Sequence, residues 1–97
     1  MEKITFVWDD RKAQQNLRKH GVSFDEASSV FFDEDAVEFF DPGHSTQEDR
    51  FLMLGTSFRF RVLVVFYCFR REGQEIRIIS ARKATNKERK IYNENKR

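Results

Sequence analysis

A pair of cations, Arg82 and Lys83, stands where an apolar stretch meets the start of a helix. Residues 75–81 favour a β-strand, and Thr85-Asn86-Lys87-Glu88 has the S/T-x-x-E form of a capping box. Guanidinium and ammonium groups beside a helix N-terminus are suited to holding a phosphate. The junction is therefore the first candidate site. A solvated pair of charges at a helix entry is the alternative interpretation.

Four other residues could supply acid–base chemistry or a further cation. His20 carries the group best suited to proton transfer near neutral pH, although Lys19-His20-Gly21 is also ordinary chemistry for the end of a helix. His44 lies in a predicted turn, where a polar residue is unremarkable. Glu48 and Arg50 are two residues apart, so on a strand they would address the same side. A charge pair at the sheet edge is the simpler interpretation of these two.

The C-terminal segment is basic and predicted to be helical. Lys87 and Arg89 could contact phosphates without regard to sequence. Tyr92 lies four residues after Glu88 and shares its helix face, where a tyrosine usually packs in the core with its hydroxyl hydrogen-bonded.

The set as a whole contains Arg, Lys, His and Glu but no metal-ligand pattern. Cys68 is the single cysteine, and neither a glycine-rich phosphate loop nor a serine nucleophile motif is present. We therefore expect no metal and no cofactor. Such residues suit phosphodiester transfer in RNA, because the substrate's own 2′-hydroxyl is the nucleophile there. DNA lacks this hydroxyl, so RNA is the favoured substrate.

Length and composition predict one globular domain over residues 1–97. The chain is 39% hydrophobic, which is enough for a modest core. Its longest apolar run, residues 62–69, is too short to cross a bilayer, and the N-terminus lacks the features of a signal peptide. We therefore expect a cytoplasmic protein that does not enter membranes.

Charge is distributed unevenly along the chain. Residues 25–49 contain nine Asp and Glu and no Lys or Arg, whereas residues 50–97 contain thirteen Lys and Arg and four Asp and Glu. This asymmetry indicates one face for a polyanion or an acidic partner, unless the fold brings the two halves together so that they compensate.

The periodicity predicts an α+β domain with the order β-α-α-β-β-β-β-α. Asp9 or Asp10 can cap the first helix and Gly21 can end it, while Ser23-Phe24-Asp25-Glu26 forms a second capping box. The last three strands should form an antiparallel meander with helices packed against the sheet. The predicted strands cover residues 5–8, 36–40, 50–56, 62–69 and 75–81, and the helices cover 11–20, a segment beginning near 24, and 86–95.

Strict alternation along the last strand separates two arginines. It places Arg82 on the face of Ile76, Ile78 and Ser80, and Arg77 on the other face. Both arginines could then reach one cleft only if the strand bends.

Four ordered blocks of residues extend over nearly the full length of the chain: Phe6-Val7-Trp8-Asp9 with Lys12-Ala13 and Asn16; Lys19-His20-Gly21-Val22-Ser23-Phe24 with Glu26-Ala27; Asp41 with His44, Glu48 and Arg50; and Ile76-Arg77-Ile78-Ile79-Ser80-Ala81-Arg82-Lys83-Ala84 with Glu88-Arg89 and Tyr92. Through these blocks the chain resembles a known family, the BrnT toxins. One departure from the family is Phe58-Arg59-Phe60-Arg61, which is bulkier than the small turn expected there.

The resemblance implies a RelE-like fold and a type II toxin that cleaves RNA and inhibits translation. It also implies a ribbon-helix-helix antitoxin similar to BrnA as partner, with DNA bound only through the antitoxin complex. It strengthens the case for His20, Glu48, Arg50, Arg82 and Lys83 as catalytic residues.

We expect Arg50 and Arg82 to clamp phosphate, and Lys83 to be a further clamp or to protonate the leaving group. His20 or Glu48 would be the acid and base, with Tyr92 a weaker candidate. A non-catalytic nucleic-acid-binding or regulatory module is the alternative function, and a protein that only docks an acidic partner is a third. The residues expected to bind RNA are Lys12, Arg77, Lys87, Arg89 and Tyr92.

Overall fold

The computed structural model describes residues 3–44 and 48–96, and its elements follow the predicted order β-α-α-β-β-β-β-α. None of the helices in these two ranges is both long and apolar enough to cross a membrane. The strands are β1 (Thr5–Val7), β2 (Val37–Phe40), β3 (Arg50–Thr56), β4 (Val62–Arg70) and β5 (Glu75–Lys83); the α-helices are α1 (Asp10–His20), α2 (Phe24–Ser29) and α3 (Asn86–Glu94); and two 3₁₀ turns cover Val30–Phe32 and Pro42–His44.

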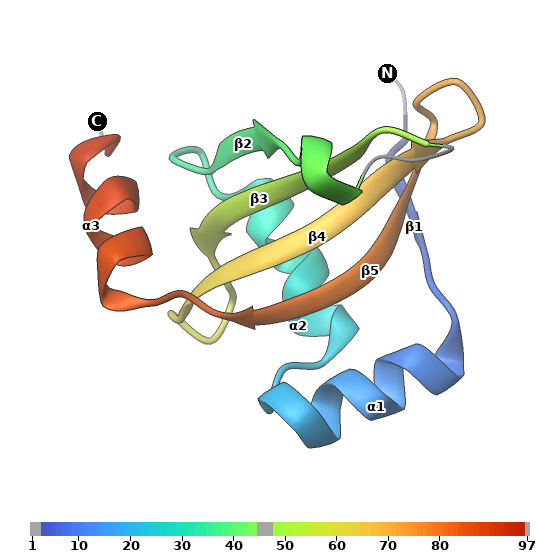
Figure 1. Ribbon diagram of the computed structural model, residues 1–97, viewed down its shortest axis with the longest axis horizontal. Helices are drawn as coiled ribbons and strands as arrows, with labels where there is room; N and C mark the ends of the chain where they lie inside the picture. The colour runs from blue at the N-terminus through green and yellow to red at the C-terminus, as the bar shows by residue number, and fades with distance from the viewer. Residues whose placement is uncertain (1–2, 45–47, 97) are drawn as a thin grey trace.

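The strands form one five-stranded sheet in the order β1-β5-β4-β3-β2 (Figure 1). Strands β2 to β5 are antiparallel neighbours in chain order, so the predicted meander of the last three strands is confirmed. The first strand adds to it in parallel, with Phe6 opposite Ile76. The sheet is therefore mixed. The segment that contains α1 and α2 connects β1 at one edge of the sheet to β2 at the other edge.

The ends of the helices confirm most of the predicted caps. The Asp9 carboxylate accepts from the Lys12 N–H, and Gly21 ends α1 with φ of 69°. At α3 both halves of the capping box are present, because Thr85 accepts from the Glu88 N–H and Glu88 accepts from the Thr85 N–H. Local hydrogen bonds thus fix where the helices that flank β5 begin and end.

The second predicted capping box is only half formed. Ser23 accepts from the Glu26 N–H at 3.0 Å, as predicted. The Glu26 carboxylate, however, turns into the core, where it accepts from Ser57 at 2.7 Å and from Arg61 Nε at 2.8 Å. The half-buried Arg61 competes successfully with a backbone N–H for this carboxylate, because the charged pair offers stronger hydrogen bonds.

The two faces of the sheet have separate cores. Helices α1 and α2 cover one face, whose buried residues include Leu63, Val65 and Tyr67 from β4. Helix α3 covers one end of the other face, where Tyr92 packs with Leu54 and Val64. The remainder of this second face, called here the open face, carries Arg50 and Leu52 of β3 and Phe66 and Cys68 of β4.

A β-bulge in β5 corrects the predicted separation of Arg77 and Arg82. The register shifts between Phe66 and Tyr67, so that Ile79 is the extra residue of β5. Arg82 lies opposite Val64 and Arg77 opposite Cys68, and both therefore project on the open face. Strict alternation was the wrong assumption, because one inserted residue reverses the facing of everything beyond it.

Asn16 joins α1 to the part of β5 that β1 leaves uncovered. The pairing of β1 ends at Val7 opposite Arg77. Beyond that point the Asn16 side chain accepts from the Ala81 N–H at 3.1 Å and donates to the Ala81 carbonyl at 2.9 Å. It also donates to the Val22 carbonyl at 2.9 Å. The side chain is buried and replaces a neighbouring strand for one residue, so it sets the position of α1 against the sheet edge.

Candidate active site

Two arginines lie over the same aromatic ring on the open face. The guanidinium carbon of Arg50 is 5.5 Å from the centre of the Phe66 ring, and that of Arg82 is 5.8 Å from it. Arg50 comes from β3, Phe66 from β4 and Arg82 from β5. The ring attracts each cation and offsets part of the repulsion between the two positive charges. The sheet therefore brings together two cations that are far apart in the sequence.

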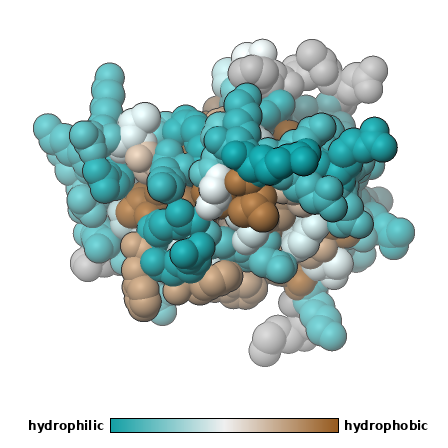
Figure 2. Space-filling model, turned by 90° about the horizontal axis from the view of Figure 1, so that it is seen from below, coloured by the Kyte–Doolittle hydropathy of each residue, from teal (hydrophilic) through white to brown (hydrophobic). Residues whose placement is uncertain are grey.

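A groove of about 310 Å³ lies between α1 and this part of the open face. His20, the last residue of α1, and Lys12 line it together with Arg50 from the sheet. In Figure 2, which views the molecule from the side of α1, hydrophilic residues cover most of the surface. The other lining residues are Gln15, Asn16, Lys19, Ile79 and Ser80.

Arg82 is held by Glu88 in the first turn of α3. Its Nη1 donates to Oε1 of Glu88 at 2.7 Å and its Nη2 to Oε2 at 3.0 Å. The pair is partly exposed, with 35% of the Arg82 side chain and 27% of the Glu88 side chain accessible. The hydrogen bonds from Arg82 lower the pKa of Glu88 to about 2, against the opposing effect of burial. Two hydrogen bonds to the Glu88 carboxylate thus orient Arg82 over Phe66.

Arg50 has an acidic neighbour as well. Its Nε lies 3.9 Å from Oδ2 of Asp41, and its backbone carbonyl accepts from the Asp41 N–H at 2.8 Å. Asp41 stands just after β2, so the strand pair β2–β3 places this carboxylate beside the arginine. Arg77, opposite Cys68 and half-buried, lies in the same cross-strand row as Arg50.

Glu48 and Lys83 lie apart from the groove. Glu48 is exposed and contacts Arg70, with 3.4 Å between Oε1 and Nη2. Lys83 pairs with Leu63, so it belongs to the sheet face opposite to that of Arg82. It lines a separate hollow at the end of β5. The structure therefore does not bring these two residues together with His20 and Arg50. The predicted turn at His44 is a 3₁₀ turn.

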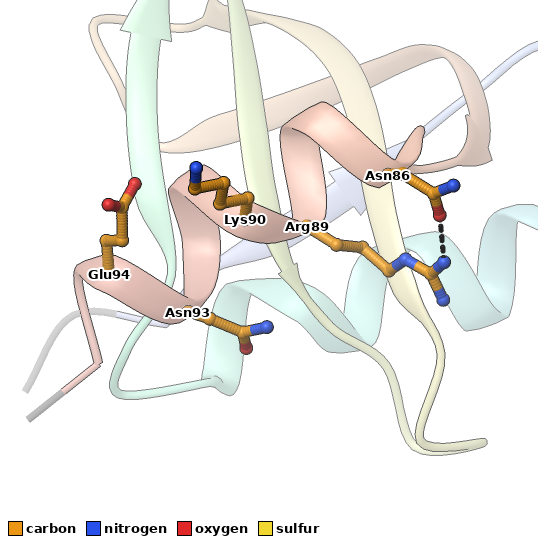
Figure 3. A pocket seen from close by; sticks show the side chains of 5 residues that line it. All are labelled: Asn86, Arg89, Lys90, Asn93 and Glu94. Atoms are coloured by element: carbon orange, nitrogen blue, oxygen red, sulfur yellow. Dashed lines mark hydrogen bonds between the residues drawn. The ribbon is translucent and has the colours of Figure 1, made fainter.

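The candidate residues of α3 divide into exposed cations and a buried tyrosine. Lys87 and Arg89 are exposed, and Arg89 donates to the Asn86 side chain on the outer surface of the helix (Figure 3). Tyr92 is only 2% exposed. Its hydroxyl donates to Asp33 and accepts from Thr56 at 2.9 Å. Burial and the bond to Asp33 raise the pKa of Tyr92, so the group stays neutral and serves to anchor α3.

Sequence reasoning missed two residues that organise the site. Phe66 belongs to a continuous apolar run. Nothing in that run distinguishes a ring that contacts cations from a ring that packs in the core. Arg61 donates to Glu26 and, at 3.0 Å, to the Gly21 carbonyl directly after His20. Despite its burial, Glu26 has a lowered pKa because Arg61 and Ser57 donate to it. This network ties the end of α1 to the β3–β4 turn.

The groove thus presents cations and an imidazole, a set that can hold a phosphate and move a proton. No group of three or more His, Cys, Asp and Glu side chains within residues 3–44 and 48–96 is placed to hold a metal ion.

Comparisons with known proteins agree with this fold. The model of a family described as the ribonuclease toxin BrnT of type II toxin–antitoxin systems matches residues 8–88. No curated protein sequence matches the chain. The fold is similar to the 1.1 Å crystal structure of the Brucella abortus ribonuclease toxin BrnT, with a TM-score of 0.65 and 23% identity over 87% of this chain and 100% of that one. The chain therefore belongs to the BrnT family of ribonuclease toxins of type II toxin–antitoxin systems.

Proposed function

We propose that this chain is a metal-independent endoribonuclease that cleaves RNA by attack of the 2′-hydroxyl and thereby inhibits translation. The observation that carries the proposal is the position of Arg50 and Arg82 over one Phe66 ring, beside a groove that also contains His20. Two cations held over the same ring can stabilise the extra negative charge of a pentacoordinate phosphate without a metal ion.

The proposed reaction needs a base, an acid and a charge clamp. The 2′-oxygen forms a bond to phosphorus while the bond from phosphorus to the 5′-oxygen breaks. The base takes the 2′-hydroxyl proton, and the acid gives a proton to the departing 5′-oxygen. The products are a 2′,3′-cyclic phosphate and a 5′-hydroxyl.

The positions of the side chains suggest how these roles are divided. Arg50 and Arg82 clamp the reacting phosphate. His20 is the acid or base that lines the groove, and Lys12 reaches an adjoining phosphate from α1. Glu48 is the second candidate for acid or base, and it would have to approach from the exposed end of β3. To bind the phosphate, the Arg82 guanidinium must either contact Glu88 and the phosphate at the same time or release Glu88.

The biological setting follows from the family. A type II toxin has an antitoxin partner, and we propose that this partner is a ribbon-helix-helix protein similar to BrnA. DNA would be bound only through the complex of the two proteins. We propose the cytoplasm as the place where this chain acts on RNA.

The test is RNA cleavage by purified protein in the presence of EDTA, with wild type, Arg50→Ala and Arg82→Ala compared after each is shown to be folded. Loss of one transition-state donor should lower the rate by about 100- to 1000-fold. Arg18→Ala is the matched control, because Arg18 is an exposed arginine of α1 that does not line the groove.

Three results would each count against the proposal. Equal cleavage by Arg82→Ala and wild type would remove Arg82 from the mechanism. Cleavage abolished by EDTA would contradict metal independence. RNA that binds in a salt-dependent manner but stays intact would favour the non-catalytic nucleic-acid-binding module.

A further inference from the structure

The turn between β3 and β4 exposes two phenylalanine rings. The side chains of Phe58 and Phe60 are 61% and 89% accessible, and neither belongs to the two buried clusters of the sheet. These two large apolar side chains on one short turn therefore leave most of their surface in water.

The backbone at Phe60 makes this exposure more unusual. Phe60 has φ of 61°, in the left-handed region. Its N–H donates to the Ser57 carbonyl, and the Ser57 N–H donates to the Arg61 carbonyl, both at 2.9 Å. Turns of this length usually have glycine or asparagine at the left-handed position, because a Cβ is disfavoured there. A phenylalanine at this position therefore lowers the stability of the fold, and its exposed ring buries little surface in return.

The turn is nevertheless built rigidly. Ser57 is buried, and its hydroxyl donates to Glu26 and accepts from the Arg59 N–H at 3.2 Å. The Phe58 N–H donates to the Ser29 hydroxyl at 2.9 Å. These bonds hold the base of the turn against α2, so the rings are presented from a fixed support. Such preorganisation favours binding, because little conformational freedom remains to be lost.

Phe60 and two cations line the same hollow of the surface. A hollow of about 400 Å³ is lined by Phe60 together with Lys83 from β5 and Arg89 from α3. Both cations are exposed, and so is Arg59 within the turn. Arg89 extends along the helix surface toward Asn86, as Figure 3 shows. An aromatic face beside several cations is complementary to a nucleotide, which offers a base that can stack and a negative phosphate.

The hollow and the proposed cleavage groove are both lined by residues of β5. Lys83 follows Arg82 in β5 and faces the opposite side of the sheet. It is three residues beyond Ser80, which lines the groove, and this corresponds to about 10 Å along a strand. One strand of RNA that passes the end of β5 could therefore reach both places.

We propose that Phe60 is a base-stacking residue for single-stranded RNA, with Lys83 and Arg89 binding the neighbouring phosphates. This inference rests on the proposed function and adds to it a second contact region outside the cleavage groove. It gives the exposed Phe60 ring of the bulky Phe58-Arg59-Phe60-Arg61 turn a role that packing does not supply.

The test uses the full chain and an RNA that the proposed reaction cannot cut. A fluorescent single-stranded 2′-O-methyl oligonucleotide of about twelve nucleotides lacks the nucleophilic hydroxyl. Its Kd is measured by anisotropy with wild type, Phe60→Gly and the double variant Lys83→Gln/Arg89→Gln. Phe60→Gly suits the left-handed backbone, so it should fold at least as stably as wild type while its Kd rises by about 5- to 150-fold.

The two kinds of contact should differ in their response to salt. Phe60→Gly should leave the slope of log Kd against log salt concentration unchanged. The double variant should make this slope shallower by about two, because it loses about two phosphate contacts. Phe32→Ala is the matched control, because Phe32 is 70% exposed and does not line the hollow. Its Kd should equal that of wild type.

The inference is overturned if Phe60→Gly binds the oligonucleotide as tightly as wild type, or if wild type does not bind it. Should Phe60→Gly bind RNA normally but fail to retain a co-expressed antitoxin, the turn is a protein-docking surface and the inference is wrong. Cleavage is measured separately on unmodified RNA. If wild type does not cleave unmodified RNA but Phe60→Gly still weakens binding of the oligonucleotide as predicted, only the proposed function is contradicted.

Discussion

Arg82 and Glu88 form a two-pronged ion pair that fastens the end of β5 to the first turn of α3. The same carboxylate completes the capping box of α3 by accepting from the Thr85 N–H at 2.8 Å. One side chain therefore starts the helix and orients the arginine that we assign to phosphate binding. The junction between β5 and α3 therefore stabilises the fold and also contributes to the candidate active site.

This pair predicts a defined response to acid. The pKa of Glu88 lies below its ordinary value, at about 2 instead of 4.5. A lowered pKa means that the stabilisation is present above pH 4.5 and is lost as the pH falls toward 2. The difference in Tm between wild type and Glu88→Gln should therefore be constant above pH 5 and shrink below pH 4.5. Glutamine keeps the form of the capping box, so the difference reports mainly the charge.

The matched control is Glu94→Gln, which changes an exposed glutamate near the end of the same helix. A Tm difference for Glu88→Gln that does not change between pH 6 and 2 would show that the ion pair does not contribute to stability.

Tyr92 should matter for stability and not for RNA binding. Tyr92→Phe keeps the buried ring but removes the hydroxyl that bonds to Asp33 and Thr56. We expect a loss of about 1–2 kcal/mol in the free energy of unfolding, measured with urea. The Kd for RNA should stay within about twofold of wild type, because the hydroxyl is covered.

A double-mutant cycle with Thr56→Val provides the control for Tyr92. The two changes should be less than additive if they break the same bond. Weaker RNA binding by Tyr92→Phe with unchanged stability would instead place the hydroxyl against RNA.

Asn16 should be essential for the position of α1. Asn16→Leu leaves the N–H and carbonyl of Ala81 without their partner in a buried place. The expected loss is on the order of 3 kcal/mol in the free energy of unfolding. Gln14→Leu, at an exposed position of α1, should change it by less than about 0.5 kcal/mol. Similar losses for the two variants in urea unfolding would contradict this role of Asn16.

Features set by near neighbours in the sequence were predictable. Asp9, Gly21 and the Thr85–Glu88 capping box act within about one helical turn, so residue type and spacing are sufficient. The order of the strands along the chain was predicted in the same way, from alternation and turn residues. Parallel pairing of β1 with β5 joins segments from opposite ends of the chain, and no local pattern specifies it.

The candidate site depended on long-range contacts and was predicted less completely. The bulge at Ile79 is a property of the pairing between β4 and β5, and it alone decides that Arg77 and Arg82 share a face. Glu26 had the spacing of a capping box, yet Arg61 captures its carboxylate from another element. Arg50 and Arg82 were named for their charge, while the Phe66 ring between them becomes visible only in the folded sheet.

The end groups of cleaved RNA test the central claim most directly. Wild-type protein in EDTA is incubated with an RNA whose main cleavage site is mapped, and with the same RNA carrying one 2′-deoxynucleotide on the 5′ side of that site. The account predicts a 2′,3′-cyclic phosphate and a 5′-hydroxyl from the first RNA and no cleavage at that site in the second. Products with a 3′-hydroxyl and a 5′-phosphate, or undiminished cleavage beside the deoxynucleotide, would contradict it.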